Sequence, residues 1–245
     1  MTQIVGIIPA RYDAKRLPGK PLALIQDRPM IQHVYERAAK AATLQRLVVA
    51  TDDPRIERAV AKFGGEVLMT SRDHPSGTDR VAEASRQLML QDDAIVINIQ
   101  GDEPLVQAEM IDSLAQILQE NTDVPMATLA YPETDRNDLP DPDVVKVVLD
   151  VKGQALYFSR SPIPAVRDEP SPPPYYKHLG FYSYRNRFLQ EFTKLSPGVL
   201  ERLEKLEQLR ALEHGFSISV VITSSDCISV DTAEDLARVR KIMEQ

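Results

Sequence analysis

The first 120 residues alternate between short apolar runs and longer amphipathic stretches, and this alternation restricts the possible folds more than any other feature. Apolar runs predict buried strands, and apolar residues at helical spacing predict helices. Strands are predicted at Ile4–Ile8, Arg46–Ala50, Glu66–Met69 and Ala94–Ile99, and helices at Met30–Ala42, Pro54–Phe63, Ser76–Leu90 and Gln107–Glu120. Because helices separate these strands, the strands should be parallel with right-handed crossovers, as in an α/β sheet.

The pattern changes in the second half, where strands follow one another without long helices between them. Strands are predicted at Met126–Tyr131, Val144–Asp150, Ala155–Ser159, His178–Tyr184 and Phe216–Thr223, and helices at Arg185–Leu195, Val199–Glu213 and Thr232–Met243. The stretch Pro162–Pro174 holds six prolines in thirteen residues. Such a stretch is extended, and we interpret it as an exposed loop or an arm that packs on a partner subunit.

Length and charge exclude several classes of protein. A chain of 245 residues allows one large α/β domain, with or without a small appendage. The net charge of -7, from 36 acidic and 29 basic residues, argues against nucleic-acid binding. A lone cysteine, Cys227, fits a reducing compartment, and neither a signal peptide nor a membrane-spanning run is apparent. We therefore expect a cytoplasmic protein that binds neither nucleic acid nor a membrane.

A basic loop follows the first predicted strand, which should end at Pro9 because proline cannot donate to a sheet ladder. The loop carries four cations: Arg11, Lys15, Arg16 and Lys20. The carboxyl ends of strands line the ligand crevice of open α/β sheets. The loop lacks the Walker pattern, because Pro21 follows Gly19-Lys20 and the upstream glycine is missing. We interpret it as the site of a nucleoside triphosphate, with a solvated basic loop as the alternative.

Two acidic positions are candidate magnesium ligands. Asp102 lies in the motif QGDEP after the strand Ala94–Ile99, and Asp231 precedes the last helix. Magnesium takes hard oxygen ligands, usually one or two carboxylates with substrate phosphates. The alternatives are a simple turn at Asp102 and a helix N-cap at Asp231. Asp231 becomes a metal candidate only if Asp102 needs a second carboxylate across the crevice.

Other polar residues have a functional and a structural interpretation. Small residues that open a helix at Ser76–Arg80 present backbone N–H groups to a phosphate, ribose or base, or form an ordinary capped helix. Arg160 could pair with a substrate carboxylate, and His178, Glu207 and Gln208 could bind sugar hydroxyls. Alternatively, Glu207 and Arg210 form a surface pair on a helix.

Together the motifs resemble those of one enzyme family. They are ARYDAKRLPGKPL, VATDDPRI, GGEVLMTSRDHPSGTDR, NIQGDEPL, KVVLD, ALYFSR, HLGFYSYR, LEKLEQLRALEHG and VDTAEDL. In this order they resemble the bacterial 3-deoxy-manno-octulosonate (Kdo) cytidylyltransferases, or CMP-Kdo synthetases, over nearly the whole chain. The opening motif is shared by many nucleotidyltransferases, whereas ALYFSR, HLGFYSYR and LEQLR are more specific.

The resemblance implies a fold and an activity. The fold is the nucleotide-diphospho-sugar transferase fold, an α/β fold with a mixed, mostly parallel sheet flanked by helices. It implies one domain over 1–245, with a β-rich, proline-rich dimerisation subregion at approximately 125–190. The implied reaction joins CTP and Kdo into CMP-Kdo and diphosphate with Mg²⁺, for lipopolysaccharide biosynthesis, in a homodimer.

The resemblance also implies roles for individual residues. Arg11 and Lys20, with Arg16 nearby, would hold the triphosphate, and Asp102 and Asp231 would bind magnesium. The nucleotide pocket would be lined by Ala10, Ser76, Gly77, Arg80 and Gln100. The sugar would be held by Arg160, His178, Tyr182, Glu207 and Gln208.

Three positions depart from the family pattern. Ala14 stands where a serine is common, Lys15 follows it, and Ser229 stands where glycine is common. The alternative activities are a cytidylyltransferase for 8-amino-3,8-dideoxy-manno-octulosonate and another sugar nucleotidyltransferase. The chemistry of the residues does not by itself distinguish CTP from UTP as the nucleotide substrate. An alternative from a different class is a metal-dependent glycosyltransferase that uses Asp52-Asp53.

Overall fold

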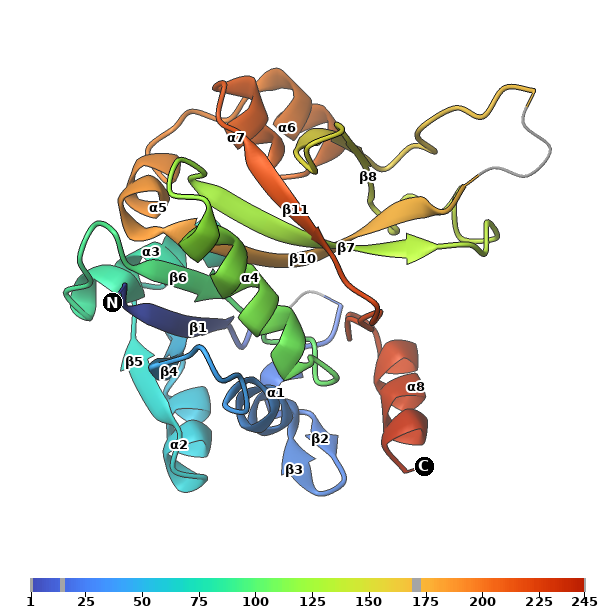
Figure 1. The fold of residues 1–245 in the computed structure, drawn as a ribbon. Helices are drawn as coiled ribbons and strands as arrows, with labels where there is room; N and C mark the ends of the chain where they lie inside the picture. Colours follow the sequence, from blue (N-terminus) through green and yellow to red (C-terminus); the bar gives the residue numbers. More distant parts are fainter. Residues whose placement is uncertain (1, 14–15, 169–172, 245) are drawn as a thin grey trace.

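Parallel strands joined by helices form the centre of the sheet, as the alternation predicts. The computed structural model describes residues 2–13, 16–168 and 173–244. Nine strands form the main sheet: β1 (Ile4–Ala10), β4 (Arg46–Thr51), β5 (Glu66–Met69), β6 (Ile95–Asn98), β7 (Met126–Glu133), β8 (Lys146–Leu149), β9 (Ala155–Ser159), β10 (Tyr175–Arg185) and β11 (Ile218–Ile222). Their order is β11-β7-β10-β6-β1-β4-β5 (Figure 1), with β8 paired to β10 and β9 paired to β8.

The sheet is mixed and mostly parallel. β6, β1, β4 and β5 are parallel to one another, and β11 is parallel to β7. β10 is antiparallel to both of its main neighbours, β6 and β7. The predicted fold class is therefore confirmed.

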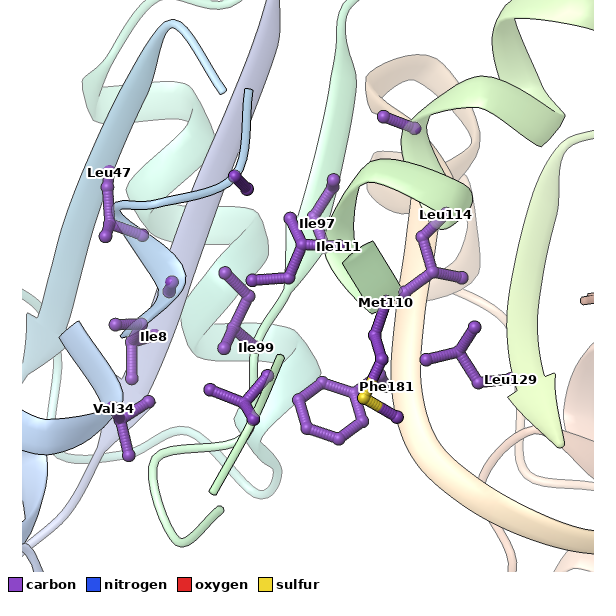
Figure 2. Close-up of a cluster of buried hydrophobic side chains, with 14 of the residues drawn as sticks. Ile8, Val34, Leu47, Ile97, Ile99, Met110, Ile111, Leu114, Leu129 and Phe181 are labelled. Carbon is purple, nitrogen blue, oxygen red and sulfur yellow. The ribbon is translucent and has the colours of Figure 1, made fainter. Parts of the chain in front are cut away.

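Helices cover both faces of this sheet. The helices are α1 (Met30–Ala38), α2 (Pro54–Lys62), α3 (Gly77–Gln87), α4 (Ala108–Glu120), α5 (Asn186–Phe192), α6 (Val199–Glu204), α7 (Leu209–Glu213) and α8 (Ala233–Met243), with a 3-10 turn at Lys20–Leu22. One core contains buried residues of α1, α2 and α4, and a second contains those of α3, α5 and α7. Figure 2 shows Met110, Ile111 and Leu114 of α4 near Ile97 and Leu129 in the first core.

The structure corrects several predicted boundaries. The first strand does not stop at Pro9 but continues to Ala10, because pairing with β6 has already ended at Ile7 and no ladder bond to β6 is lost. The first helix ends at Ala38 rather than Ala42. A short hairpin of β2 (Leu24–Ile25) and β3 (Arg28–Pro29) was not predicted.

The largest correction concerns the predicted helix Val199–Glu213. It is two helices, α6 and α7, because Lys205 takes a left-handed conformation with φ of 55° at the end of α6. This break places Glu207 and Gln208 in the turn between the two helices.

The proline-rich segment leaves the body of the molecule after β9 (Figure 1). Its described residues 161–168 are exposed apart from a half-buried Ile163. Whether it packs on a partner subunit stays a prediction. None of the helices in the described ranges is both long enough and apolar enough to cross a membrane.

Candidate active site

A pocket of about 490 Å³ opens where β1 and β6 end, at the edge of the sheet where a ligand crevice was expected. Ten predicted site residues line it: Ala10, Arg11, Arg16, Lys20, Ser76, Gly77, Arg80, Gln100, Asp102 and Asp231. Segments separated by more than 200 positions in the chain meet there. Both predicted metal ligands and all predicted nucleotide-binding residues therefore share one cavity.

The two aspartates converge on the ammonium group of Lys20. Lys20 Nζ is 2.6 Å from Asp102 Oδ2 and 3.0 Å from Asp231 Oδ1, and Arg16 Nη2 is 2.9 Å from Asp231 Oδ2. The Val230 N–H donates to the Asp102 carbonyl at 2.9 Å, which ties the two acidic segments together. Burial opposes the charge on Lys20, but the two carboxylates outweigh it and raise the lysine pKa. The aspartates thus form a site for a cation.

Asp231 is available for this site because another residue caps the last helix. Thr232 is the N-cap of α8 and forms a capping box with Asp235. The alternative interpretation of Asp231 as the N-cap is therefore wrong. Ser229 is half-buried beside Val230, and the other two departures, Ala14 and Lys15, lie outside the described residues.

The N-terminus of α3 forms the opposite side of the pocket. Ser76 caps this helix and accepts a hydrogen bond from the Asp79 N–H at 3.2 Å. The unpaired N–H groups of the first turn and the helix dipole favour an anion. A side chain at Gly77 would lie 3.6 Å from Pro9, in ordinary contact, so space alone does not require this glycine.

Arg80 is buried and held on one side by protein groups. Its Nη1 donates to the Thr70 hydroxyl, and its Nη2 is 3.1 Å from Asp52 Oδ1. Burial lowers the pKa of Arg80, and Asp52 opposes this effect. A fixed guanidinium at the pocket wall suits recognition of a nucleotide group.

The pair Asp52-Asp53 does not form a metal site. Asp52 pairs with Arg80, and Asp53 accepts from the Arg55 backbone at 2.8 Å as the N-cap of α2. The Arg55 side chain also binds Asp53 and lowers the aspartate pKa to about 2. Asp52 therefore holds the pocket arginine and Asp53 caps a helix, which are the structural roles of these two carboxylates.

The five predicted sugar-binding residues do not line this pocket, but contacts connect the β10 segment that holds His178 and Tyr182, and also Glu207, to its wall. Gln100 of the pocket donates through Nε2 to the Gly180 carbonyl at 2.6 Å, between His178 and Tyr182 on β10. The rings of His178 and Tyr182 have centroids 5.6 Å apart. Thr78 of α3 donates to the carboxylate of Glu207. A second group of polar residues therefore borders the nucleotide pocket.

Glu207 and Gln208 face inward from the turn between α6 and α7. Burial raises the pKa of Glu207, and its hydrogen bonds to Thr78 and Ser76 oppose the rise. Arg210 is 3.7 Å from Glu207 but binds Glu201 at 2.6 and 2.9 Å, so the predicted surface pair is at most a minor contact. The Gln208 amide nitrogen is buried without a hydrogen-bond partner among the described residues. Such an amide is suited to receive a ligand oxygen.

Arg160 is anchored by two residues that the sequence analysis missed. Its Nε donates to the Glu204 carbonyl at 2.8 Å, and its backbone N–H donates to the Glu204 carboxylate at 3.0 Å. Lys146 is fully buried and donates to the carbonyls of Arg160, Asp141 and Val144 at 2.6, 2.9 and 2.5 Å. The sequence feature that indicates a structural role for Lys146 is its position within the apolar run VVKVV, because a buried charge needs hydrogen-bond partners.

Comparison with known proteins places the chain in a family. A family model described as cytidylyltransferase matches residues 5–232. The 3-deoxy-manno-octulosonate cytidylyltransferase of Syntrophobacter fumaroxidans is 59% identical over 244 residues, covering 99% of this chain and 98% of the relative. The 8-amino-3,8-dideoxy-manno-octulosonate cytidylyltransferase of Shewanella amazonensis is 53% identical over 233 residues, covering 95% of each.

A solved structure matches over the whole length. It is a CMP:2-keto-3-deoxy-manno-octonic acid synthetase complexed with CTP, with a TM-score of 0.94 and 43% identity, and the match covers 100% of this chain and 99% of that one. The similarity in sequence and the similarity in fold therefore both extend over nearly the whole chain. The chain belongs to the cytidylyltransferase family.

Proposed function

We propose that this protein transfers CMP from CTP to the anomeric hydroxyl of 3-deoxy-manno-octulosonate, giving CMP-Kdo and diphosphate for lipopolysaccharide biosynthesis. The observation that carries the proposal is the pocket that joins Lys20, Asp102 and Asp231 to the N-terminus of α3. The similar structure complexed with CTP and the relatives of the same activity support it.

The charges of the pocket suit transfer of a nucleotidyl group. The sugar hydroxyl attacks the α-phosphorus and loses its proton, a new oxygen–phosphorus bond forms, and the bond to diphosphate breaks. Arg11, Arg16 and Lys20 would stabilise the charge that develops on the leaving diphosphate. Holding both substrates in one crevice supplies a further part of the rate enhancement.

Asp102 and Asp231 would hold Mg²⁺. Their oxygens already converge on one cation, the Lys20 ammonium, and carboxylate oxygens are the ligands that this metal prefers. Bound there, Mg²⁺ would neutralise phosphate charge and increase the acidity of the attacking hydroxyl. No nucleophilic side chain is needed for this chemistry.

The second polar group would hold the sugar acid. Arg160 would bind the carboxylate, and His178, Tyr182, Glu207 and Gln208 would bind hydroxyls. The 8-amino sugar is the second candidate substrate, because relatives at 53% identity carry that activity in their names. A homodimer in the cytoplasm completes the proposal.

The test is diphosphate release by the purified protein with Mg²⁺, a panel of sugar acids and either CTP or UTP. We expect release with CTP and Kdo, and a product with the mass of CMP-Kdo. Faster release with the 8-amino sugar would favour the second candidate. No release above background with any sugar acid would contradict the proposal.

A further inference from the structure

A bulge in β10 separates two of the proposed sugar-binding residues. Leu179 pairs with Leu129 of β7, and Tyr182 pairs with the adjacent Thr128, so two residues of β10 have no partner in β7. Thr128 is fully buried, and its side chain fills this irregularity. Its hydroxyl therefore lies at the base of the loop between His178 and Tyr182.

The hydroxyl of Thr128 meets three polar atoms. Its Oγ1 is 2.7 Å from the Phe181 carbonyl, 3.3 Å from the Leu179 carbonyl and 3.0 Å from His178 Nε2. A carbonyl can only accept, and a hydroxyl has one hydrogen to donate. Two oxygens 2.7 Å apart repel unless a hydrogen lies between them, so the hydrogen is directed at the Phe181 carbonyl, which is the nearer of the two. Only an oxygen lone pair remains for His178, so Nε2 must carry a hydrogen.

This assignment determines the other nitrogen of the ring. Burial lowers the pKa of His178 to about 3, so the imidazole is neutral near pH 7 and carries one N–H. With the hydrogen on Nε2, Nδ1 has a free lone pair. Nδ1 has no hydrogen-bond partner in the described part of the chain, and it is not one of the buried side-chain atoms that lack a partner. Nδ1 is therefore open to a ligand.

Aromatic neighbours restrict the orientation of the ring. The ring of Phe158 meets His178 edge-on, with a centroid distance of 4.9 Å and an interplanar angle of 73°. The Tyr182 ring is tilted against it at 5.6 Å. Rotation of the imidazole would disturb both contacts and the bond to Thr128.

We propose that Thr128 is a positioning residue that holds His178 in the Nε2–H tautomer, so that Nδ1 accepts a hydrogen bond from a sugar hydroxyl. The inference rests on the proposed function, which places His178 in the sugar site. It excludes His178 as a partner of the sugar's negative carboxylate, because a neutral ring with an exposed lone pair repels an anion. Because Nδ1 carries no hydrogen, its partner must be a donor, and a sugar hydroxyl can donate whereas a carboxylate cannot.

The first measurement needs no substrate. Long-range nitrogen–hydrogen NMR correlation on protein labelled with nitrogen-15 histidine reports the tautomer of each of the four histidines. The variant His178→Gln identifies the signals of His178. We expect a single neutral form at pH 7 with the hydrogen on Nε2. A hydrogen on Nδ1, or on both nitrogens, would overturn the inference.

The second measurement is the kinetics of matched variants. Thr128→Val removes the hydroxyl with little change in shape, and Thr128→Ser keeps it. Ser183→Ala removes a neighbouring buried hydroxyl that has no partner among the residues that the structure describes. We expect the KM for the sugar acid to rise about tenfold in Thr128→Val, with the KM for CTP unchanged and both controls near wild type. An unchanged sugar KM in folded Thr128→Val, or an equal rise in Ser183→Ala, would refute the positioning role.

A failure of this inference can be distinguished from a failure of the proposed function. A wild-type protein that acts on no sugar acid contradicts the proposed function, whereas the tautomer is measured in the free protein. If Thr128→Val does not fold, Thr128→Ser and the wild-type NMR result still decide the inference. A serine variant with the wrong tautomer but normal sugar KM would refute it.

Discussion

Replacing Lys20 with methionine tests the cation site directly. Methionine has a similar length but no charge, so Asp102 and Asp231 lose the cation that lies between them. We expect the variant to be less stable without metal, because Asp102 then loses its counter-charge and Asp231 keeps only its ion pair with Arg16. We also expect the nucleotide-free variant to bind Mg²⁺ more tightly than wild type does, because no resident ammonium competes.

The size of the effect follows from the two contacts. Each is a charge-assisted hydrogen bond, at 2.6 and 3.0 Å, and such bonds contribute about 1.5–3 kcal/mol. The carboxylates are 26% and 38% exposed, so solvent screening favours the low end of this range. The two contacts together contribute roughly 3 kcal/mol, which Mg²⁺ must offset when it displaces the ammonium in wild type. Their removal therefore corresponds to a roughly hundredfold gain in Mg²⁺ affinity.

The assay is thermal unfolding of nucleotide-free protein over a series of MgCl₂ concentrations. Metal that binds the folded state raises Tm by mass action, so Lys20→Met should show a larger rise, at lower Mg²⁺, than wild type. Lys177→Met is the matched control, because Lys177 is also half-buried but pairs with one carboxylate, Asp226, at 2.8 Å. Equal Mg²⁺-dependent shifts in Lys20→Met and wild type would refute the reasoning.

Three further predictions follow from the same structure. Asp102→Asn and Asp231→Asn should each lose most diphosphate release while keeping a wild-type circular dichroism spectrum; full activity in either would show that the metal assignment is wrong. Lys146→Met should lower the free energy of unfolding in urea by about 3 kcal/mol, because three carbonyls lose their donor; exposed Lys152→Met is the control, and an equally small loss in both contradicts the prediction. The pKa of Asp53, lowered from 3.8 to about 2, stabilises the fold above pH 3.8, and this contribution disappears as the pH falls towards 2. Asp53→Asn keeps the cap but should lack this acid-dependent loss in urea unfolding, with normal activity at pH 7; identical pH profiles would count against it.

Local pattern was a reliable guide to the elements of the sheet. Apolar runs located all nine main strands, although β10 begins at Tyr175 rather than His178. Asp53 and Thr232, which stand at the starts of the two predicted helices Pro54–Phe63 and Thr232–Met243, are N-caps, because a cap depends on residues within one turn of the chain. The fold class followed from the alternation of these elements.

Local pattern was a poor guide where distant groups decide the conformation. The helix predicted at Val199–Glu213 breaks at Lys205, where Glu204 binds the end of β9 through Ser159 at 2.7 Å. Helical periodicity does not register such a contact. The roles of Glu204 and Lys146 depend in the same way on partners that come together only when β8, β9 and α6 pack.

Some residues of the candidate site could be predicted from local sequence, and others are brought together only by the fold. Residue types and spacing were sufficient to select the basic loop, Asp102 and the start of α3, because each follows a strand or opens a helix in an α/β chain. Only the folded chain brings Asp231 within 3.0 Å of Lys20, 211 positions away, and brings Thr128 to His178. Both the convergence of the carboxylates and the tautomer of His178 depend on distances of a few ångströms between segments that are far apart in the sequence. The packing of the sheet determines these distances.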